Sequence, residues 1–265
     1  MKIPRNCPNC GAEAYDDLRL GNEEWTIGAC QACGFAYLTA ALPYEDLSEA
    51  HAWEKSFEVE AKRRKKKRPV FSWIDQKTRW RLHLFPRPET EIFISKFVRS
   101  GNVVDVGCGS GGHVLRLPED TVPYGVEISK GLAAQADELF RSKGGYCVHA
   151  PSVQGLQQFD SGMFDGAMLN SYLEHETQPL EVLQEVKRVL KPDGLAVVKV
   201  PNFGSLNAKV MRASWCGIRL PDHVNYFTEH SLSDMASKAG LSAKFPRLAN
   251  LPTNDNFWAF LRPVA

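Results

Sequence analysis

Residues 103–113 of this chain read Val-Val-Asp-Val-Gly-Cys-Gly-Ser-Gly-Gly-His, so an acid and a ladder of glycines interrupt and follow an apolar run. The run predicts a buried strand, and the glycines predict a tight turn whose backbone passes close to a ligand, with a helix-length pattern behind it. Gly107 and Gly109 lack the Cβ atoms that would block this approach, and Gly111 allows the next helix to pack near the strand. A second apolar run ends in Glu127, about twenty residues farther on, where a carboxylate for ribose hydroxyls belongs. An ordinary glycine turn would not require this acid, so the pattern favours a cofactor that contains ribose.

The spacing of the glycines separates two classes of such cofactors. A dinucleotide-binding turn spells G-x-G-x-x-G, because a pyrophosphate lies on the helix N-terminus. Here the third glycine, Gly111, comes one residue early, and Asp105 would repel a phosphate while suiting an α-ammonium group. The sequence resembles the class I S-adenosylmethionine-dependent methyltransferases, whose Asp-x-Gly-x-Gly-x-Gly loop holds the methionine end of the cofactor.

The resemblance implies a set of cofactor contacts beyond the glycine loop. The acid that closes the second strand would hold the ribose hydroxyls, and the segment after the fourth strand would line the cofactor. Many relatives carry an acid near the adenine amino group after the third strand, whereas this chain has Ser152, so this side chain or a backbone group would replace it. The implied cofactor residues are Asp105, Gly107, Cys108, Gly109, Gly111, Glu127, Ile128, Ser152, Asn170 and Tyr172.

Apolar periodicity predicts alternating strands and helices over the same part of the chain. Helical spacing occurs at 132–140, 182–190 and 228–239, and the lysine-led turn 191–194 should end the second of these helices. Strands are predicted at 103–106, 122–126, 145–149, 164–170 and 195–200, with a closing antiparallel pair near 242–248 and 257–261. This order predicts an α/β fold with a doubly wound sheet, and the resemblance implies the seven-stranded, Rossmann-like methyltransferase sheet.

Two C-x-x-C knuckles, each followed by glycine, lie near the N-terminus: Cys7 with Cys10, and Cys30 with Cys33. This spacing predicts a tetrahedral Cys₄ zinc site, which is structural because four thiolates leave no position for water. Disulfides are the alternative, and they would require an oxidising compartment. No apolar signal segment or membrane span is evident, so we expect a cytoplasmic protein with reduced cysteines.

The formal net charge of +1 hides a local excess of positive charge. Residues 62–81 carry ten basic residues and one acid, which is +9, and the basic run 62–68 is its densest part. A phosphate-binding patch for RNA or a nucleotide-linked substrate would explain this run, Lys62–Arg68. A solvated helix end is the simpler explanation and the one we favour. The chain therefore divides into a zinc ribbon (1–40), a helical, partly basic connecting segment (41–87) and a methyltransferase domain (88–265).

Candidate catalytic groups follow the fourth predicted strand and recur near residue 223. Residues 170–175, Asn-Ser-Tyr-Leu-Glu-His, resemble the family's post-strand segment, and residues 221–228 resemble an insertion of small-molecule and sugar-type methyltransferases. His175 and His223 are candidate general bases, since imidazole titrates near neutral pH. We therefore expect methylation of a hydroxyl on a small metabolite such as a sugar, sugar nucleotide or quinol. An RNA base methyltransferase and a non-catalytic cofactor-binding protein are the alternatives.

Overall fold

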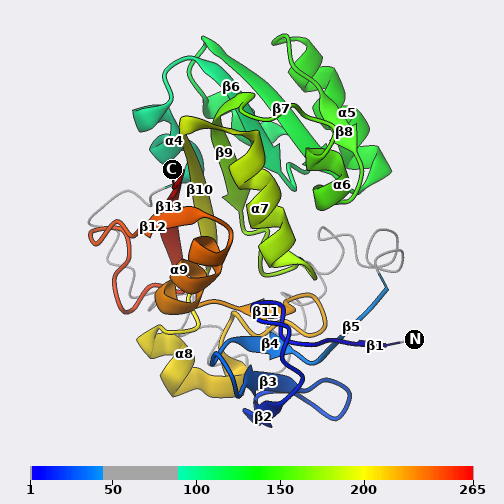
Figure 1. Ribbon diagram of the computed structural model, residues 1–265, viewed down its shortest axis with the longest axis vertical. Coiled ribbons are helices and arrows are strands. Elements are labelled where there is room, and N and C mark those ends of the chain that lie inside the picture. The colour runs from blue at the N-terminus through cyan, green and yellow to red at the C-terminus, as the bar shows by residue number, and fades with distance from the viewer. Residues whose placement is uncertain (1, 44–88, 265) are drawn as a thin grey trace, which may run out of the picture.

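A computed structural model describes residues 2–43 and 89–264 of the chain (Figure 1). Nearly all of the predicted connecting segment, including the basic run Lys62–Arg68, lies outside the described residues. None of the helices within the described ranges is long and apolar enough to cross a membrane.

The larger part of the molecule is a seven-stranded sheet with the order β12-β13-β10-β9-β6-β7-β8. The parallel strands are β6 (Gly101–Val106), β7 (Thr121–Glu127), β8 (Cys147–His149), β9 (Phe164–Asn170) and β10 (Leu190–Pro201). The antiparallel pair is β12 (Leu241–Lys244) and β13 (Asn256–Pro263), as the sequence predicts. The strand order reverses between β6 and β9, and open α/β sheets bind ligands outside the carboxyl ends of strands at such a point.

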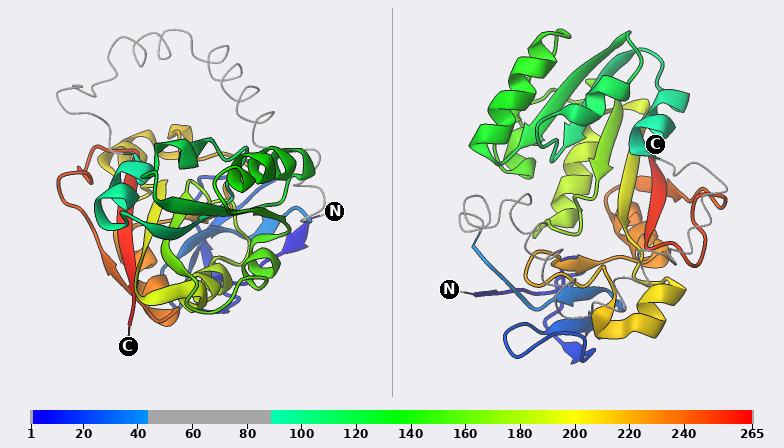
Figure 2. Two further views of the ribbon diagram at one scale, coloured as in Figure 1. Left: turned by 90° about the horizontal axis from the view of Figure 1, so that it is seen from above. Right: turned by 180° about the vertical axis from the view of Figure 1, so that it is seen from behind.

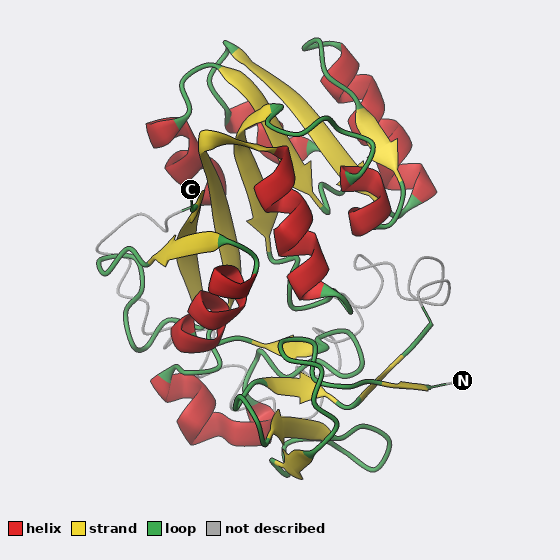
Figure 3. Ribbon diagram, viewed as in Figure 1, coloured by secondary structure: helices red, strands yellow, loops and turns green. Residues whose placement is uncertain are grey.

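Helices cover both faces of this sheet (Figure 3). Alternation along β6 sends Val103 and Val104 into two different apolar clusters, one on each face. One cluster includes α6 (Ser152–Leu156), α7 (Pro179–Val189) and α9 (Glu229–Lys238). The other includes α4 (Thr90–Phe97), the 3₁₀ helix η1 (Gly112–Arg116) and α5 (Lys130–Arg141). The fold is thus the three-layered, doubly wound arrangement that the sequence predicts.

Two local predictions differ from the structure. The glycine loop leads into the five-residue η1 rather than a full helix, because Gly111 takes a left-handed φ of 81° and Leu117 is already extended. The predicted turn at 191–194 lies within the bounds of β10 instead of preceding it. There Leu190 pairs with Phe164 and regular pairing resumes at Leu195, so the intervening residues form an irregularity in the strand.

A second, four-stranded sheet has the order β11-β4-β3-β2 and lies beside the lower ends of α7 and α9 (Figures 1 and 2). Three of its strands come from the N-terminal region: β2 (Tyr15–Asp17), β3 (Ile27–Cys30) and β4 (Ala36–Leu38). The fourth strand, β11 (Asn225–Tyr226), comes from the segment that precedes α9. This segment begins after α8 (Leu206–Met211) and the short helix η2 (Arg212–Ser214). Short β1 (Ile3–Pro4) and β5 (Ala40–Ala41) form a separate pair. The cysteine-containing region is therefore built into the molecule through β11.

A partly buried arginine, Arg5, joins these two regions. The Arg5 guanidinium donates to the carbonyl oxygens of Leu38, Val224 and Thr177, and to Oδ1 of Asn225 at 3.1 Å. Its burial lowers the pKa of Arg5 to about 10, which still leaves it charged at neutral pH. One side chain of the N-terminal region thus holds both β11 and the loop that follows β9.

Asn225 completes this connection from the β11 side. Its Nδ2 donates to the carbonyl oxygens of Leu173, at 2.8 Å, and Glu176, while its backbone N–H donates to Glu174. The side chain is only 2% exposed, so water cannot replace these bonds.

We expect Asn225→Ala to lower the free energy of unfolding by about 2–4 kcal/mol, because it removes three buried hydrogen bonds and leaves Arg5 short of an acceptor. Urea unfolding measures this change. In the matched variant Asn254→Ala the side chain loses a single bond, to Ala249, and the expected cost is about 1 kcal/mol or less. Equal losses in the two variants would show that Asn225 does not join the two regions.

Candidate functional site

The glycine loop lies at the carboxyl end of β6, next to the point where the strand order reverses. Gly107 and Gly109 have left-handed φ values of 71° and 56°. A Cβ atom on Gly109 would have no neighbour within 4 Å, so the space in front of this residue is open. A Cβ on Gly107 would lie 2.3 Å from the ring of Tyr172, which packs directly on the loop. The loop therefore presents bare backbone to a ligand on one side and is supported by an aromatic ring on the other.

Asp105, the next-to-last residue of β6, carries a buried carboxylate. It is 1% exposed, and its Oδ2 has no hydrogen-bond partner within the described parts of the chain. Burial raises the pKa of Asp105 to about 7, an effect that the charges of Glu91 and Glu127 reinforce and that of His113 opposes. A buried, unpartnered carboxylate is costly, so this position favours a cationic ligand group.

Glu127, at the end of β7, shapes the same loop. Its Oε2 accepts from the backbone N–H of Gly109 at 2.9 Å, and its Oε1 accepts from that of Ser129 at 2.8 Å. Each carboxylate oxygen has a second lone pair, so both can also accept from ribose hydroxyls. The neighbouring Ile128 carbonyl lies 3.0 Å from Nε2 of His149. The acid predicted from the sequence thus reaches the predicted loop.

Cys108 contributes its backbone to the loop, because its side chain turns toward β7 and β8. Its Sγ lies 3.6 Å from Sγ of Cys147, and a Cβ on Gly125 would touch it. The contact with Cys147 and burial raise the pKa of the Cys108 thiol. Both sulfurs belong to cysteines outside any disulfide, which agrees with the expectation of reduced, mostly buried thiols.

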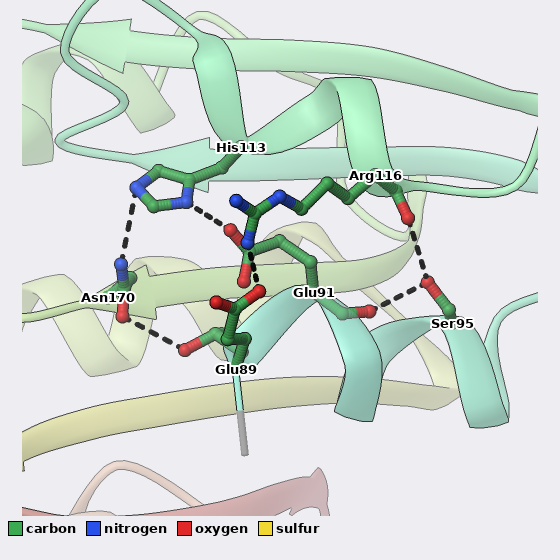
Figure 4. Close-up of polar contacts among 7 residues, drawn as sticks. Glu89, Glu91, Ser95, His113, Arg116 and Asn170 are labelled. Carbon is green, nitrogen blue, oxygen red and sulfur yellow. Dashed lines mark hydrogen bonds and ion pairs between the residues drawn. The ribbon is translucent and has the colours of Figure 1, made fainter. Parts of the chain in front are cut away.

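A polar network that the sequence did not suggest ties the loop to α4 and β9 (Figure 4). Nδ1 of His113 contacts the Glu91 carboxylate, and its Nε2 lies 3.3 Å from Nδ2 of Asn170. Oδ1 of Asn170 accepts from the Thr90 hydroxyl at 3.0 Å. The hydrogen bond that the His113 ring donates to the buried Glu91 carboxylate raises the pKa of His113. Asn170, predicted to contact the cofactor, is therefore held in place from two sides.

Two further contacts fix the start of α4. The Ser95 hydroxyl donates to the carbonyl of Glu91 at 2.7 Å, and Arg116 pairs with Glu89 (Figure 4). The contacts between the α4 region and η1 join residues that are more than twenty positions apart in the chain. Helical periodicity alone therefore gave no signal for this network.

The loop after β9 centres on a carboxylate that the sequence analysis missed. Glu176 is 2% exposed, and its Oε2 accepts from the hydroxyls of Ser152, at 2.6 Å, and Tyr172. Its Oε1 accepts from the backbone N–H of Gln178 at 2.9 Å, just before α7 begins. Ser152, predicted near adenine, thus directs its hydroxyl to Glu176. The sequence feature that could have indicated Glu176 is its position three residues before Pro179, which occupies the first position of α7.

The two predicted histidines lie side by side, His175 in this loop and His223 in the segment that leads into β11. The ring centroids of His175 and His223 are 4.7 Å apart and their planes are perpendicular. His175 Nδ1 lies 2.9 Å from the carbonyl oxygen of Asp222, and His223 Nδ1 lies 2.8 Å from that of Gly217. Because a carbonyl only accepts, each Nδ1 carries the proton. Burial lowers the pKa of His175 to about 4, so this ring is neutral near pH 7.

Glu174 stands beside the two imidazoles. It is 2% exposed, and its Oε2 is without a hydrogen-bond partner among the residues described. Burial raises the pKa of Glu174 to about 8, although the charges of Lys199 and Arg219 act in the opposite direction. One ligand atom from each of Glu174, His175 and His223 lies within 4.8 Å of the others.

The four N-terminal cysteines form a second cluster. Cys7 Sγ is 3.6 Å from Cys33 Sγ, and Cys10 Sγ is 3.5 Å from Cys30 Sγ. Four sulfurs about 2.3 Å from a central Zn²⁺ would be roughly 3.8 Å apart, so the cluster has the size of a tetrahedral site. Each knuckle closes through a glycine N–H that donates to the carbonyl of its first cysteine, at 2.8 Å. The arrangement fits a zinc ribbon.

A model of the family described as "Methyltransferase domain" matches residues 76–243, which is more than half of the chain. The chain belongs to this methyltransferase family. Its fold also matches a SAM-dependent methyltransferase from Methanosarcina mazei, with a TM-score of 0.51 and 18% identity over 68% of this chain and 98% of that one. A SAM-dependent methyltransferase from Aquifex aeolicus gives a TM-score of 0.51 and 18% identity, over 69% and 93% of the two chains.

Curated relatives of the methyltransferase match over part of their length. An uncharacterized chloroplastic methyltransferase of Arabidopsis thaliana is 26% identical over 69% of this chain and 57% of its own. An uncharacterized methyltransferase of Schizosaccharomyces pombe is 31% identical over 49% of each chain. A biotin biosynthesis bifunctional protein of Teredinibacter turnerae is 28% identical, and the chain covers 26% of it. The chain thus spans between about a quarter and three fifths of these relatives.

The family match and the fold agree with the geometry of the glycine loop. The chain therefore contains a methyltransferase domain with a Rossmann-like fold.

Proposed function

We propose that this enzyme methylates a hydroxyl group of a small metabolite, of the sugar, sugar nucleotide or quinol type. The supporting observation is the pair of imidazoles, His175 and His223, whose rings are in edge-to-face contact. When a hydroxyl attacks, its oxygen forms a bond to the methyl carbon, and the electron pair of the C–S bond stays on sulfur. The hydroxyl proton must leave, and the two imidazoles are the groups that promote its loss, in the simplest case as general bases.

We further propose which residues hold the cofactor. Asp105 would bind the α-ammonium group, with the backbone of Gly107, Cys108, Gly109 and Gly111 along the methionine chain. Glu127 and Ile128 would hold the ribose, Ser152 would lie near adenine, and Asn170 and Tyr172 would line the site. Three observations support this assignment: the unpartnered Oδ2 of Asp105, the open space before Gly109 and the position of Glu127. The cofactor supplies the reactive methyl group, so the chain has only to orient donor and acceptor.

The pKa of Asp105 makes the cofactor assignment testable. Above about pH 7 the carboxylate is ionised and should attract the ammonium group; below it, binding first requires loss of a proton. We expect the affinity for S-adenosylhomocysteine to fall by up to about tenfold for each pH unit below this pKa. Calorimetry at about pH 8 and about pH 6 measures the change.

Two controls accompany this measurement. 5′-Methylthioadenosine lacks the ammonium group, so its affinity should change little between the two pH values. Asp105→Asn should remove most of the dependence and leave only the smaller contribution of His113, which also titrates nearby. Equal pH dependence for both ligands would remove Asp105 from the ammonium site.

We also propose that the four clustered cysteines hold a structural Zn²⁺. Elemental analysis should find about one zinc in this cluster per chain, and Cys30→Ser should release it. Because β3 and β4 belong to the four-stranded sheet and not to the seven-stranded one, loss of the metal should disturb the ribbon and spare the parallel sheet, so S-adenosylhomocysteine should still bind. Cys147→Ser, outside the cluster, should keep its zinc. Protein prepared under reducing conditions that holds two disulfides and no metal would refute the site.

The acceptor class can be tested with methyl-labelled S-adenosylmethionine. The enzyme is offered sugar nucleotides, phenols and quinols in parallel with total RNA, and the label should enter a small-molecule hydroxyl. His175→Gln and His223→Gln should lower turnover about a hundredfold with little change in S-adenosylhomocysteine affinity, whereas exposed His230→Gln should not. Enzyme-dependent label in RNA alone would replace the small-molecule acceptor with an RNA base.

A further inference from the structure

Glu174, His175 and His223 form the most concentrated group of metal-ligating side chains outside the cysteine cluster in the described part of the chain. They come from two segments, the loop after β9 and the segment that leads into β11. The backbone N–H of Val224 donates to the carbonyl of Glu174 at 2.8 Å and holds the segments together. The three side chains are therefore positioned by the fold rather than by chance contact on a surface.

The imidazoles carry their protons where metal-bound histidines usually carry them. In each ring Nδ1–H donates to a backbone carbonyl, of Asp222 or Gly217, which places the lone pair on Nε2. A hydrogen bond from the ring nitrogen that does not bind the metal to a carbonyl commonly orients a histidine ligand and increases its basicity.

Glu174 supplies the second, independent observation. Its carboxylate is buried, and Oε2 has no hydrogen-bond partner within the described residues. One oxygen of the same carboxylate lies within 4.8 Å of a ligand atom of each histidine. A buried oxygen without a donor is destabilising unless a cation or proton reaches it. A metal ion held by the three groups would satisfy this oxygen.

We propose that Glu174, His175 and His223 bind a divalent transition metal, with Zn²⁺ and Co²⁺ as suitable ions. Two imidazoles and one carboxylate suit these borderline metals, whereas Mg²⁺ prefers an all-oxygen set. Three protein ligands leave a coordination position for a substrate oxygen. The site is thus distinct in type from the closed Cys₄ cluster.

The charges around the site affect its affinity for a metal ion relative to that of the Cys₄ cluster. Lys199 and Arg219 lie close enough for their positive charges to act on Glu174. The same cations repel a metal ion. The site should therefore lose its metal to a chelator before the cysteine cluster does.

The site also gives the proposed function a more specific chemistry, and this part of the inference rests on the proposed function. A substrate hydroxyl coordinated to the metal would release its proton to solvent, and its oxygen would then attack the methyl carbon as the C–S bond breaks. The products are a methyl ether and S-adenosylhomocysteine. In this role the imidazoles are ligands, and the metal makes the hydroxyl acidic.

The test is a metal count on the full-length, tag-free protein. After dialysis against Zn²⁺, wild type should hold about two ions per chain, one in each cluster. Glu174→Gln and His175→Gln should each lose one ion, while His230→Gln should keep both. Excess Mg²⁺ should not displace the ion. Bound S-adenosylhomocysteine in each variant shows that the fold is intact, so loss of a metal cannot be attributed to unfolding.

Cobalt replacement identifies which site each ion occupies. The Cys₄ cluster should give thiolate-to-cobalt charge-transfer bands, and the second ion should add visible bands without increasing them. A wild-type protein with the same metal count and cobalt spectrum as His175→Gln would overturn the proposal. Metal binding without hydroxyl methylation would instead contradict the proposed function and leave the site standing, whereas full methylation by protein lacking this ion would remove its catalytic role.

Discussion

The buried hydrogen bonds of Arg5 and Asn225 are the contacts on which the arrangement of the two regions depends. The guanidinium of Arg5 is partly buried, and it donates hydrogen bonds to carbonyl oxygens and to Oδ1 of Asn225. Asn225 in turn binds two carbonyls of the loop after β9. Desolvation of a guanidinium is costly, so these acceptors must all be in place together. These hydrogen bonds therefore join the N-terminal sheet to β11 and to the loop after β9.

That unit extends to the cofactor loop through Glu176. The carboxylate of Glu176 holds the hydroxyl of Tyr172, and the ring of Tyr172 packs on Gly107. The charge of Glu176 also acts on Arg5, which completes a continuous series of contacts from the cysteine-containing region to the glycine loop. The N-terminal region is therefore connected through hydrogen bonds to the loop after β9.

The sequence predicted well the features that are local in the chain. The glycine loop, the acid at Glu127, the parallel strands and the knuckle cysteines depend on spacing within short segments, and the structure contains each of them. It gave no sign that Asn225 joins the N-terminal sheet, or that Glu91 reaches His113, because these contacts join residues far apart in the chain. Glu176 was not predicted either, because the hydroxyl of Ser152 that it binds belongs to a distant part of the chain. The sequence indicated His175 and His223 as separate candidate bases, but the contact between their rings depends on the fold, because the two residues lie far apart in the chain.

Two buried carboxylates show where the fold tolerates instability for function. Asp105 and Glu174 each have an oxygen without a hydrogen-bond partner in the described ranges, and burial raises the pKa of both. Glu176 is equally buried, yet four donors surround it. The contrast separates structural from functional acids, because a carboxylate that serves the fold acquires donors from it. Each of the two unsatisfied oxygens is suited to a positive charge that a ligand would bring. At Asp105 the proposed charge is the ammonium group of the cofactor, and at Glu174 it is the proposed metal ion.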